Sequence, residues 1–321
     1  MQSRKAAFNA IQNEKIFDGP SVVTLGNFDG VHTGHRQLIG KAAMSAKKRC
    51  LPMVVVTFDP HPLKLLSPEQ YSGQLMTLPQ KLSVFESLGV DRVWIIHFGR
   101  EFSELGPEAF LDGLQTNLAP VELHVGQAFR FGQNRLGDVS TLQTWGNGFG
   151  CTVHTYAFRA SDGGVLSSSR IRRALADGDV GFAFELLGAP FMLTGVVVEG
   201  DRRGRRMGFP TANLAWEQEL LPAPGVYVTA VHCPGHFTGP VPGLTNVGIK
   251  PTFRGQNLTV ETHLPGIHAD IYGARAELGF LNRLRGEEAF ESPEILKNKI
   301  AEDVENGIAW WESKSLWPKL T

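Results

Sequence analysis

Residues 21–35 read SVVTLGNFDGVHTGH, an apolar run followed by a glycine-rich turn with two histidines. The run predicts a buried β-strand that ends at Gly26, and a helix should begin near Gly34 or His35. His32 and His35 are three residues apart, so they can share one face of the first helical turn. Backbone N–H groups at a helix start attract anions, and imidazoles can donate hydrogen bonds to phosphate oxygens. We therefore expect phosphate chemistry beyond this strand, with ordinary surface histidines as the alternative.

The first half of the chain alternates short apolar runs with amphipathic stretches. The predicted strands cover residues 21–25, 53–58, 92–98, 121–125 and 151–158, and the predicted helices cover 34–49, 79–88, 107–118, 169–176 and 180–187. This alternation predicts an α/β fold, a Rossmann-like domain whose parallel sheet carries helices on both faces. Ligands in such folds bind beyond the carboxyl ends of the strands, where the two histidines are expected.

The composition changes after Leu187. Between residues 191 and 279, glycine and proline are frequent and the apolar runs are short, which predicts antiparallel strands in a small β-barrel or sandwich. A C-terminal helix should follow Ser292, which can cap it, and its apolar stripe should pack against the barrel. We expect two domains, residues 1–187 and 188–321.

The gross composition describes an ordinary globular protein. Of the 321 residues, 42% are hydrophobic and 20% are charged, and the net charge is −1. No overall field therefore favours nucleic acid or an anionic membrane, and no apolar run is long enough to span a bilayer. The N-terminus has no long apolar segment, and the three cysteines are far apart in the sequence. We expect a soluble cytoplasmic protein with reduced thiols, either a monomer or a weak homo-oligomer.

A second candidate site begins in residues 195–214, GVVVEGDRRGRRMGFPTANL. Its glycines do not fit a P-loop, but Thr211 and Asn213 alternate along an extended segment and point to one face. Their oxygen atoms suit Mg²⁺ with nucleotide phosphates. Glu261 is a candidate general base, with a solvent-facing strand glutamate as the alternative. The basic run Arg202, Arg203, Arg205 and Arg206 could instead contact RNA, but it lacks interleaved aromatic residues.

Three further segments accompany the histidines. Residues 166–172 read LSSSRIR, which places Ser168, Ser169 and Arg172 at a predicted helix start. At such a position these side chains could hold pyrophosphate. Residues 57–62, TFDPHP, and 124–132, HVGQAFRFG, each follow a predicted strand. All of these segments can therefore converge on one edge of the sheet.

The HTGH sequence after a strand and turn resembles the HxGH element of the nucleotidylyltransferase superfamily, whose histidines bind the triphosphate of ATP or CTP. With FRFG, SSSRIR, GFPTANL, NVGIKPTF, VETHL and RLRGEE in this order, nearly the whole chain resembles the bacterial bifunctional riboflavin kinase/FMN adenylyltransferase family, the FAD synthetases. The resemblance implies that the second domain makes FMN from riboflavin and MgATP. It implies that the first domain then transfers AMP from ATP to FMN, which gives FAD and pyrophosphate.

The resemblance also implies the roles of individual residues. In the adenylyl site, it makes His32 and His35 catalytic and assigns ATP contacts to Gly26, Phe28, Asp29, Gly34, Ser168, Ser169 and Arg172, and flavin or nucleotide contacts to Asp59, His61 and Arg130. In the kinase site, it makes Glu261 the base, places Mg²⁺ at Thr211 and Asn213, and assigns ATP contacts to Gly200, Gly204, Gly208, Pro210, Thr211 and Asn213, and a flavin contact to Arg285.

The chain departs from the family pattern in three places. Ala128 stands before FRFG where an acidic residue or asparagine is usual, Ser169 replaces a threonine, and the loop after His263 lacks the usual aspartate. Two alternatives therefore stay open: a riboflavin kinase with a weakened adenylyl site, and a regulator that binds flavin or nucleotide without turnover.

Overall fold

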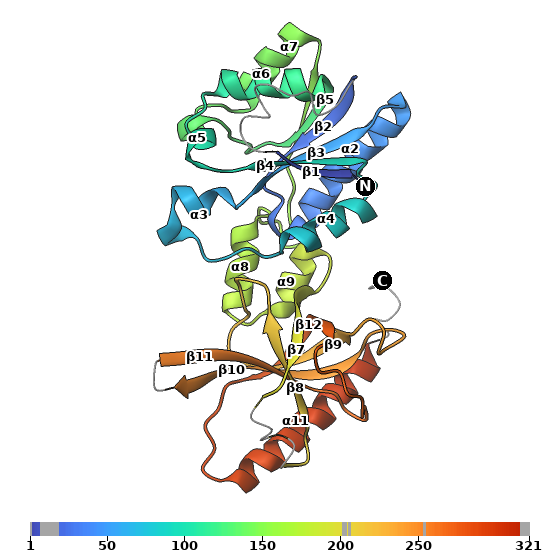
Figure 1. Cartoon of the computed structure of the whole chain (residues 1–321), viewed down its shortest axis with the longest axis vertical. Helices are drawn as coiled ribbons and strands as arrows, with labels where there is room; N and C mark the ends of the chain where they lie inside the picture. The colour runs from blue at the N-terminus through green and yellow to red at the C-terminus, as the bar shows by residue number, and fades with distance from the viewer. Residues whose placement is uncertain (1, 7–18, 201–203, 205–206, 253–254, 315–321) are drawn as a thin grey trace. The chain divides into compact units, whose positions relative to one another are not determined.

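The computed structural model describes residues 2–6, 19–200, 204, 207–252 and 255–314. The chain divides into two compact units, residues 1–167 and 168–321. The first is an α/β unit and the second is a β-barrel unit with helices (Figure 1). Both parts of the predicted fold class are thereby confirmed.

The first unit is built on a six-stranded parallel sheet with strand order β1-β4-β3-β2-β5-β6. Its strands are β1 (Gln2–Ala6), β2 (Ser21–Leu25), β3 (Met53–Asp59), β4 (Arg92–His97), β5 (Pro120–Gly126) and β6 (Thr152–Tyr156). Its helices are α2 (Thr33–Arg49), α3 (Pro62–Leu66), α4 (Leu78–Ser87), α5 (Arg100–Ser103), α6 (Pro107–Leu118) and α7 (Val139–Phe149), with 3₁₀ turns η1 (Asp29–Val31), η2 (Pro68–Gln70) and η3 (Gln133–Arg135).

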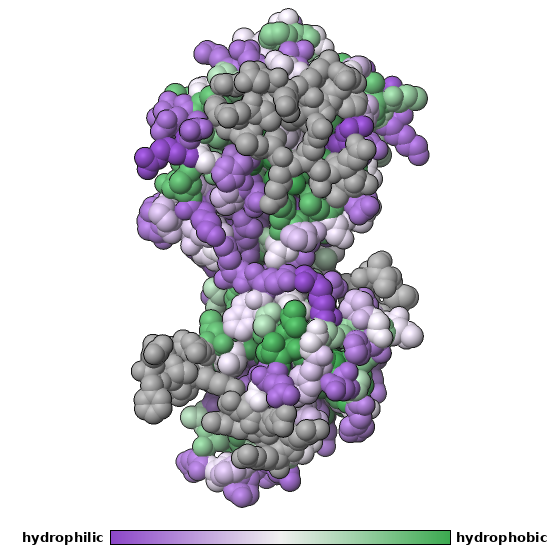
Figure 2. Space-filling model, viewed as in Figure 1, coloured by the Kyte–Doolittle hydropathy of each residue, from purple (hydrophilic) through white to green (hydrophobic). Residues whose placement is uncertain are grey.

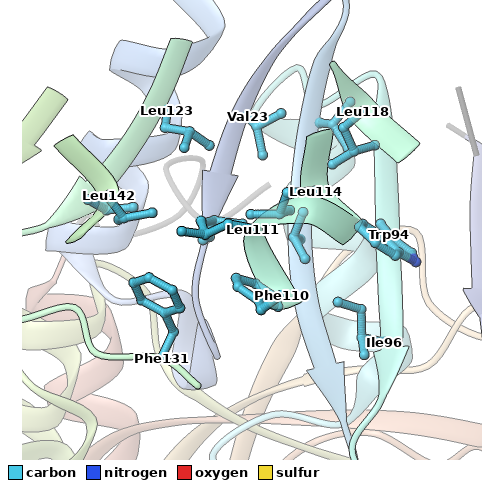
Figure 3. Packing of buried hydrophobic residues seen from close by; sticks show 14 of the residues in the cluster. Val23, Trp94, Ile96, Phe110, Leu111, Leu114, Leu118, Leu123, Phe131 and Leu142 are labelled. Atoms are coloured by element: carbon cyan, nitrogen blue, oxygen red, sulfur yellow. The ribbon is translucent and has the colours of Figure 1, made fainter. Parts of the chain in front are cut away.

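The two faces of the sheet carry separate apolar clusters, because successive side chains of a strand point to opposite faces. One cluster joins residues such as Val23 and Ile96 to α6, whose Phe110, Leu111 and Leu114 lie beside the strands (Figure 3). The other joins neighbouring strand residues such as Val22 to α2 and α4. The strands are therefore apolar on both faces, as parallel sheets covered by helices require.

The second unit is a closed antiparallel barrel with strand order β10-β11-β8-β7-β12-β9. Its strands are β7 (Phe191–Val198), β8 (Thr211–Trp216), β9 (Gly225–His232), β10 (Val241–Thr252), β11 (Gly255–His263) and β12 (Arg275–Gly286), and its helices are α8 (Ser168–Ala176), α9 (Val180–Leu187) and α11 (Pro293–Ser313). Each strand pairs with two neighbours along part of its length, so the described barrel has no edge strand. Helix α11 packs against β9, β10 and β12, as its apolar stripe predicts.

Helices α8 and α9 pack on each other, and α9 also contacts β7 and β12 of the barrel. Compactness therefore groups both helices with the second unit. A functional boundary is a different property from compactness, and the expected division at residues 187 and 188 stays a prediction.

Within the described ranges, no helix combines the length and the hydropathy that are needed to cross a bilayer. The face shown in Figure 2 mixes polar and apolar residues.

Candidate active sites

The turn after β2 is shaped by the residues of GNFDG. Phe28 adopts a left-handed backbone conformation, with φ 49°, and its ring is buried against Phe85 at 5.6 Å between centroids. A Cβ at Gly26 would lie 3.1 Å from the ring of Phe28. The turn is thus held by packing of its own aromatic residue, which directs the chain into η1 and α2.

The two histidines meet at the start of α2, as predicted. His32 is the N-cap residue, and its Nδ1 accepts a hydrogen bond from the backbone N–H of His35 at 3.2 Å. The two rings are stacked, with 3.6 Å between centroids and 12° between planes. The helix starts at Thr33, slightly earlier than expected, because His32 itself supplies the cap.

Burial keeps both imidazoles neutral at neutral pH. Desolvation lowers the pKa of His32 to about 4. Desolvation, followed by the charges of His32 and Lys81, lowers the pKa of His35 well below its usual value. The Nδ1 atom of His35 is buried and has no hydrogen-bond partner among the described residues. A neutral imidazole carries one N–H donor, so the pair is suited to bind phosphate oxygens without prior protonation.

Lys81 is a component of this site that the sequence analysis missed. It is only 3% exposed, and its Nζ donates to the carbonyl oxygen of Asn27 at 2.9 Å. Burial lowers its pKa, while Asp29 and Asp59 act in the opposite direction. One signal was present in the sequence: Lys81 lies four residues before Phe85, on the buried stripe of α4. A lysine on an apolar helix face is expected to be buried, and a buried lysine needs a hydrogen-bonding or charged partner.

Gly34 and Asp29 also have structural roles at this site. A Cβ at Gly34 would lie 2.9 Å from the Cβ of Phe158, so a side chain there would push the helix start away from its neighbour. Asp29 is buried, and its Oδ1 accepts a hydrogen bond from the backbone N–H of Leu75 at 3.0 Å. Their expected contacts with ATP stay predictions.

The more distant members of the adenylyl site are engaged locally. His61 is the buried N-cap residue of α3, and its Nδ1 accepts from the backbone N–H of Leu63 at 3.2 Å. Arg130 forms a 2.7 Å ion pair with Asp138, the N-cap residue of α7. Hydrogen bonds from the Ser140 hydroxyl and the backbone N–H of Thr141, followed by the bond from Arg130, lower the pKa of Asp138. Ala128 is exposed after β5.

Ser168, Ser169 and Arg172 lie in the first turns of α8, so the expected helix start is confirmed. They belong to the second compact unit, whereas the histidines belong to the first. Their expected approach to the histidine pair stays a prediction.

The barrel unit contains a cavity of about 420 Å³, a size that suits a drug-sized ligand. Gly204, Thr211, Glu261 and Arg285 all line it, so four predicted kinase residues are brought together. The remaining lining residues come from β9, β10 and β11, from the segments before β8 and after β12, and from α11; they include Phe209, Asn246, His263, Glu287, Phe290, Leu296, Ile300, Asp303 and Val304.

The strand pairing of β8 with β11 assembles the acidic end of this site. Asn213 lies directly opposite Glu261, and the Oγ1 of Thr211 donates to the Oε2 of Glu261 at 3.4 Å. A Cβ at Gly200 would lie 2.1 Å from the amide nitrogen of Asn213, so a side chain there would displace the carboxamide. Hydroxyl, carboxamide and carboxylate oxygens are the donors that Mg²⁺ prefers, and these three residues therefore fit a magnesium site.

The glycine-rich segment before β8 also needs glycine at particular positions. A Cβ at Gly204 would lie 2.3 Å from the carbonyl oxygen of Phe209, and Gly208 has φ +93°. The carbonyl oxygen of Pro210 accepts a hydrogen bond from His263 at 2.8 Å, which links the segment to the end of β11. The basic run Arg202, Arg203, Arg205 and Arg206, with its alternative role as an RNA contact, lies outside the described residues.

Arg285 is held by an aspartate that the sequence analysis did not single out. Its Nε and Nη2 donate to the carboxylate of Asp303 at 3.0 and 2.8 Å, and the two side chains are 14% and 8% exposed. Its guanidinium also lies over the ring of Phe290 at 5.4 Å. Asp303 directly precedes Val304, which belongs to the apolar stripe of α11. A charged residue next to an apolar stripe was the signal for a buried partner in the sequence.

Family models match both halves of the chain. The model described as FAD synthetase matches residues 14–170, and the model described as riboflavin kinase matches residues 187–311. A bifunctional riboflavin kinase/FMN adenylyltransferase from Escherichia coli K12 is 39% identical over 88% of this chain and 90% of its own length. The chain belongs to the bifunctional riboflavin kinase/FMN adenylyltransferase family. A Bacillus subtilis member of this family is 33% identical over 91% of the chain and 93% of its own length.

A solved structure is similar to this chain in fold. A crystal structure described as a macrolide-efflux protein from Streptococcus pneumoniae superposes with a TM-score of 0.83 at 28% identity, covering 94% of this chain and 97% of its own. Its name refers to macrolide efflux, whereas the sequence relatives are named for riboflavin kinase and FMN adenylyltransferase. The membership of this chain in that family rests on the family models and the sequence relatives.

Proposed function

We propose that this chain phosphorylates riboflavin to FMN with ATP and then adenylylates FMN with a second ATP to give FAD and pyrophosphate. The observation that carries the proposal is that the histidine pair lies in the first compact unit, the kinase residues lie in the second, and each half of the chain has its own family match. A kinase without the second activity is not favoured, because the adenylyl half retains both histidines, with their rings stacked at the start of α2.

In the kinase reaction, the 5′-oxygen of riboflavin bonds to the γ-phosphorus of ATP, the bond from this phosphorus to ADP breaks, and Glu261 takes the hydroxyl proton. Glu261 lines the cavity, so its carboxylate is within reach of a bound flavin. Thr211 and Asn213 would hold Mg²⁺, which neutralises charge on the phosphates when it is bound. Arg285 also lines the cavity and would contact the flavin.

In the adenylyl reaction, a phosphate oxygen of FMN bonds to the α-phosphorus of ATP and pyrophosphate leaves. No proton has to be removed from the attacking phosphate, so no general base is needed. His32 and His35 donate hydrogen bonds to the polyphosphate as charge shifts toward the leaving group. Ser168, Ser169 and Arg172 hold the pyrophosphate, and Asp59, His61 and Arg130 contact the flavin nucleotide.

The test uses the purified full chain with ATP and Mg²⁺, with riboflavin or FMN as substrate and chromatography of the flavins as the readout. Glu261→Gln should lower the rate of FMN formation by about 10²–10⁴-fold and leave the conversion of FMN to FAD unchanged. His35→Gln should lower FAD formation by about 10²–10³-fold and leave FMN formation unchanged. Loss of both activities in either folded variant would refute the assignment of separate sites, and unchanged riboflavin with the wild type would refute the enzymatic proposal.

A further inference from the structure

A polar cluster interrupts the apolar face of the sheet beneath α2. Glu122 and His124 lie two residues apart on β5, so they point to the same face. His154 on β6 lies directly opposite His124, and Tyr156 follows two residues later on the same strand. Glu122 and His124 are 4% and 2% exposed. Neither the adenylyl chemistry nor the kinase chemistry uses these side chains.

The cluster brings three metal-binding side chains together. The Oε2 atom of Glu122 lies 3.1 Å from the Nε2 of His124 and 3.7 Å from the Nε2 of His154. One potential ligand atom from each residue lies within 4.8 Å of the other two. A tetrahedral zinc ion with bonds of about 2.1 Å separates its ligand atoms by roughly 3.4 Å. The two measured distances bracket this value, so an ion needs only small side-chain shifts.

Arg49 binds only one of the two carboxylate oxygens of Glu122. Arg49 donates from Nε and Nη2 to the Oε1 of Glu122, both at 2.6 Å, which directs Oε2 toward the imidazoles. Ser45 of α2 donates to the same Oε2 atom. His154 is 39% exposed on an edge strand, so an ion can reach the cluster from solvent.

Tyr156 allows His124 to act as a ligand. The Nδ1 of His124 lies 3.0 Å from the hydroxyl of Tyr156, which can donate or accept a hydrogen bond. His124 can therefore keep its proton on Nε2 to reach Glu122, or move it to Nδ1 and present the lone pair of Nε2 to a cation. Metal-binding histidines usually have such a partner on the second nitrogen.

We infer that Glu122, His124 and His154 form a binding site for a divalent transition cation, with Zn²⁺ as the natural occupant. Two imidazoles and one carboxylate favour Zn²⁺ over Mg²⁺, because Mg²⁺ prefers oxygen ligands. Ser45 follows His32 by 13 residues along α2, which is roughly 20 Å of helix, so the site is separate from the histidine pair. A bound ion would tie the edge strand β6 to β5.

The experiment titrates Zn²⁺ into the chelator-treated full chain in the presence of excess Mg²⁺, with calorimetry as the readout. Co²⁺ then replaces Zn²⁺ to report coordination through its visible absorption. One ion per chain with the spectrum of tetrahedral Co²⁺ is expected. His154→Gln should weaken binding by at least about tenfold, and Tyr156→Phe should weaken it by about tenfold through the second nitrogen of His124.

His97→Gln is the matched control, because His97 is an exposed strand histidine of the same unit outside the cluster. It should leave Zn²⁺ affinity unchanged, and circular dichroism should confirm that all variants are folded. No binding by the wild type would overturn the inference, and the cluster would then be a hydrogen-bond network only. Binding that survives His154→Gln but is lost in His32→Gln would place the ion at the histidine pair and would overturn it equally.

Discussion

The histidine site takes its two central side chains from four consecutive residues, whereas the kinase cavity takes its residues from β8, β11, β12 and α11. In the first site, local backbone geometry sets the arrangement: His32 caps the helix through the N–H of His35. In the second site, strand pairing and a buried ion pair set it. A site of the first kind depends on a turn and a helix start, and one of the second kind depends on closure of the whole barrel.

The largest structural effect should come from the ion pair of the kinase cavity. Asp303→Asn leaves Arg285 without its anionic partner at a nearly buried position, so the unfolding free energy of the barrel unit should fall by about 2–4 kcal/mol. Arg285 is then less well positioned, and KM for riboflavin should rise by about tenfold, equivalent to about 1.4 kcal/mol. Urea denaturation and kinase kinetics measure the two effects.

Glu302→Gln is the matched control on the same helix, because Glu302 forms an exposed 2.9 Å pair with Lys299. Its loss should cost less than about 1 kcal/mol. FMN adenylylation should be unaffected in both variants. An Asp303→Asn variant with unchanged KM and unchanged stability would show that the ion pair does not organise the cavity.

The next largest effect concerns pH: acid should lower the unfolding free energy through His32. His32 has a pKa of about 4 in the folded chain against about 6.5 when unfolded, so the unfolded state binds the proton first as pH falls. Stability is therefore full above pH 6.5 and is lost between pH 6.5 and 4, by about 3 kcal/mol for this residue. The measurement compares urea denaturation of the wild type and His32→Gln across this range. Equal pH dependence of the two proteins would contradict the burial of a neutral His32.

The smallest effect concerns packing at the helix start. Gly34→Ala introduces a Cβ only 2.9 Å from that of Phe158, and the resulting strain should cost about 1–3 kcal/mol. Gly40→Ala on the same helix is the control, because its Cβ would meet no atom within 4 Å. That variant should gain about 0.5–1 kcal/mol from helix propensity. Thermal denaturation and FAD formation measure both; equal stabilities would mean that Phe158 yields without cost.

Much of the fold was predictable because its signals are local. The predicted strand 21–25 and helices 107–118 and 180–187 coincide with β2, α6 and α9. Strand β1 was missed because its pairing with β4 is made over about 90 residues and leaves no pattern in its own sequence. Helix α7 was missed because its glycines obscure the helical pattern, although Asp138 and Thr141 form a capping box.

In the candidate sites too, the local contacts were predictable and the long-range contacts were not. His32 and His35 could be paired from their spacing, since three residues of helix bring two side chains to one face. The contact of Lys81 with Asn27 and that of Asp303 with Arg285 each join segments that are distant in the sequence. Spacing carries no information about such contacts, because they exist only after the elements have packed.

The amino-acid sequence by itself determined the two-part architecture and the histidine pair, since periodicity and short spacings encode them directly, and the family resemblance indicated the residues of the kinase site. Only the tertiary structure decided the low pKa of His32, the anchoring of Arg285 and the cluster of Glu122, His124 and His154. The physical reason is that burial and long-range proximity depend on the packing of whole elements, whereas helix and strand formation depends on neighbouring residues.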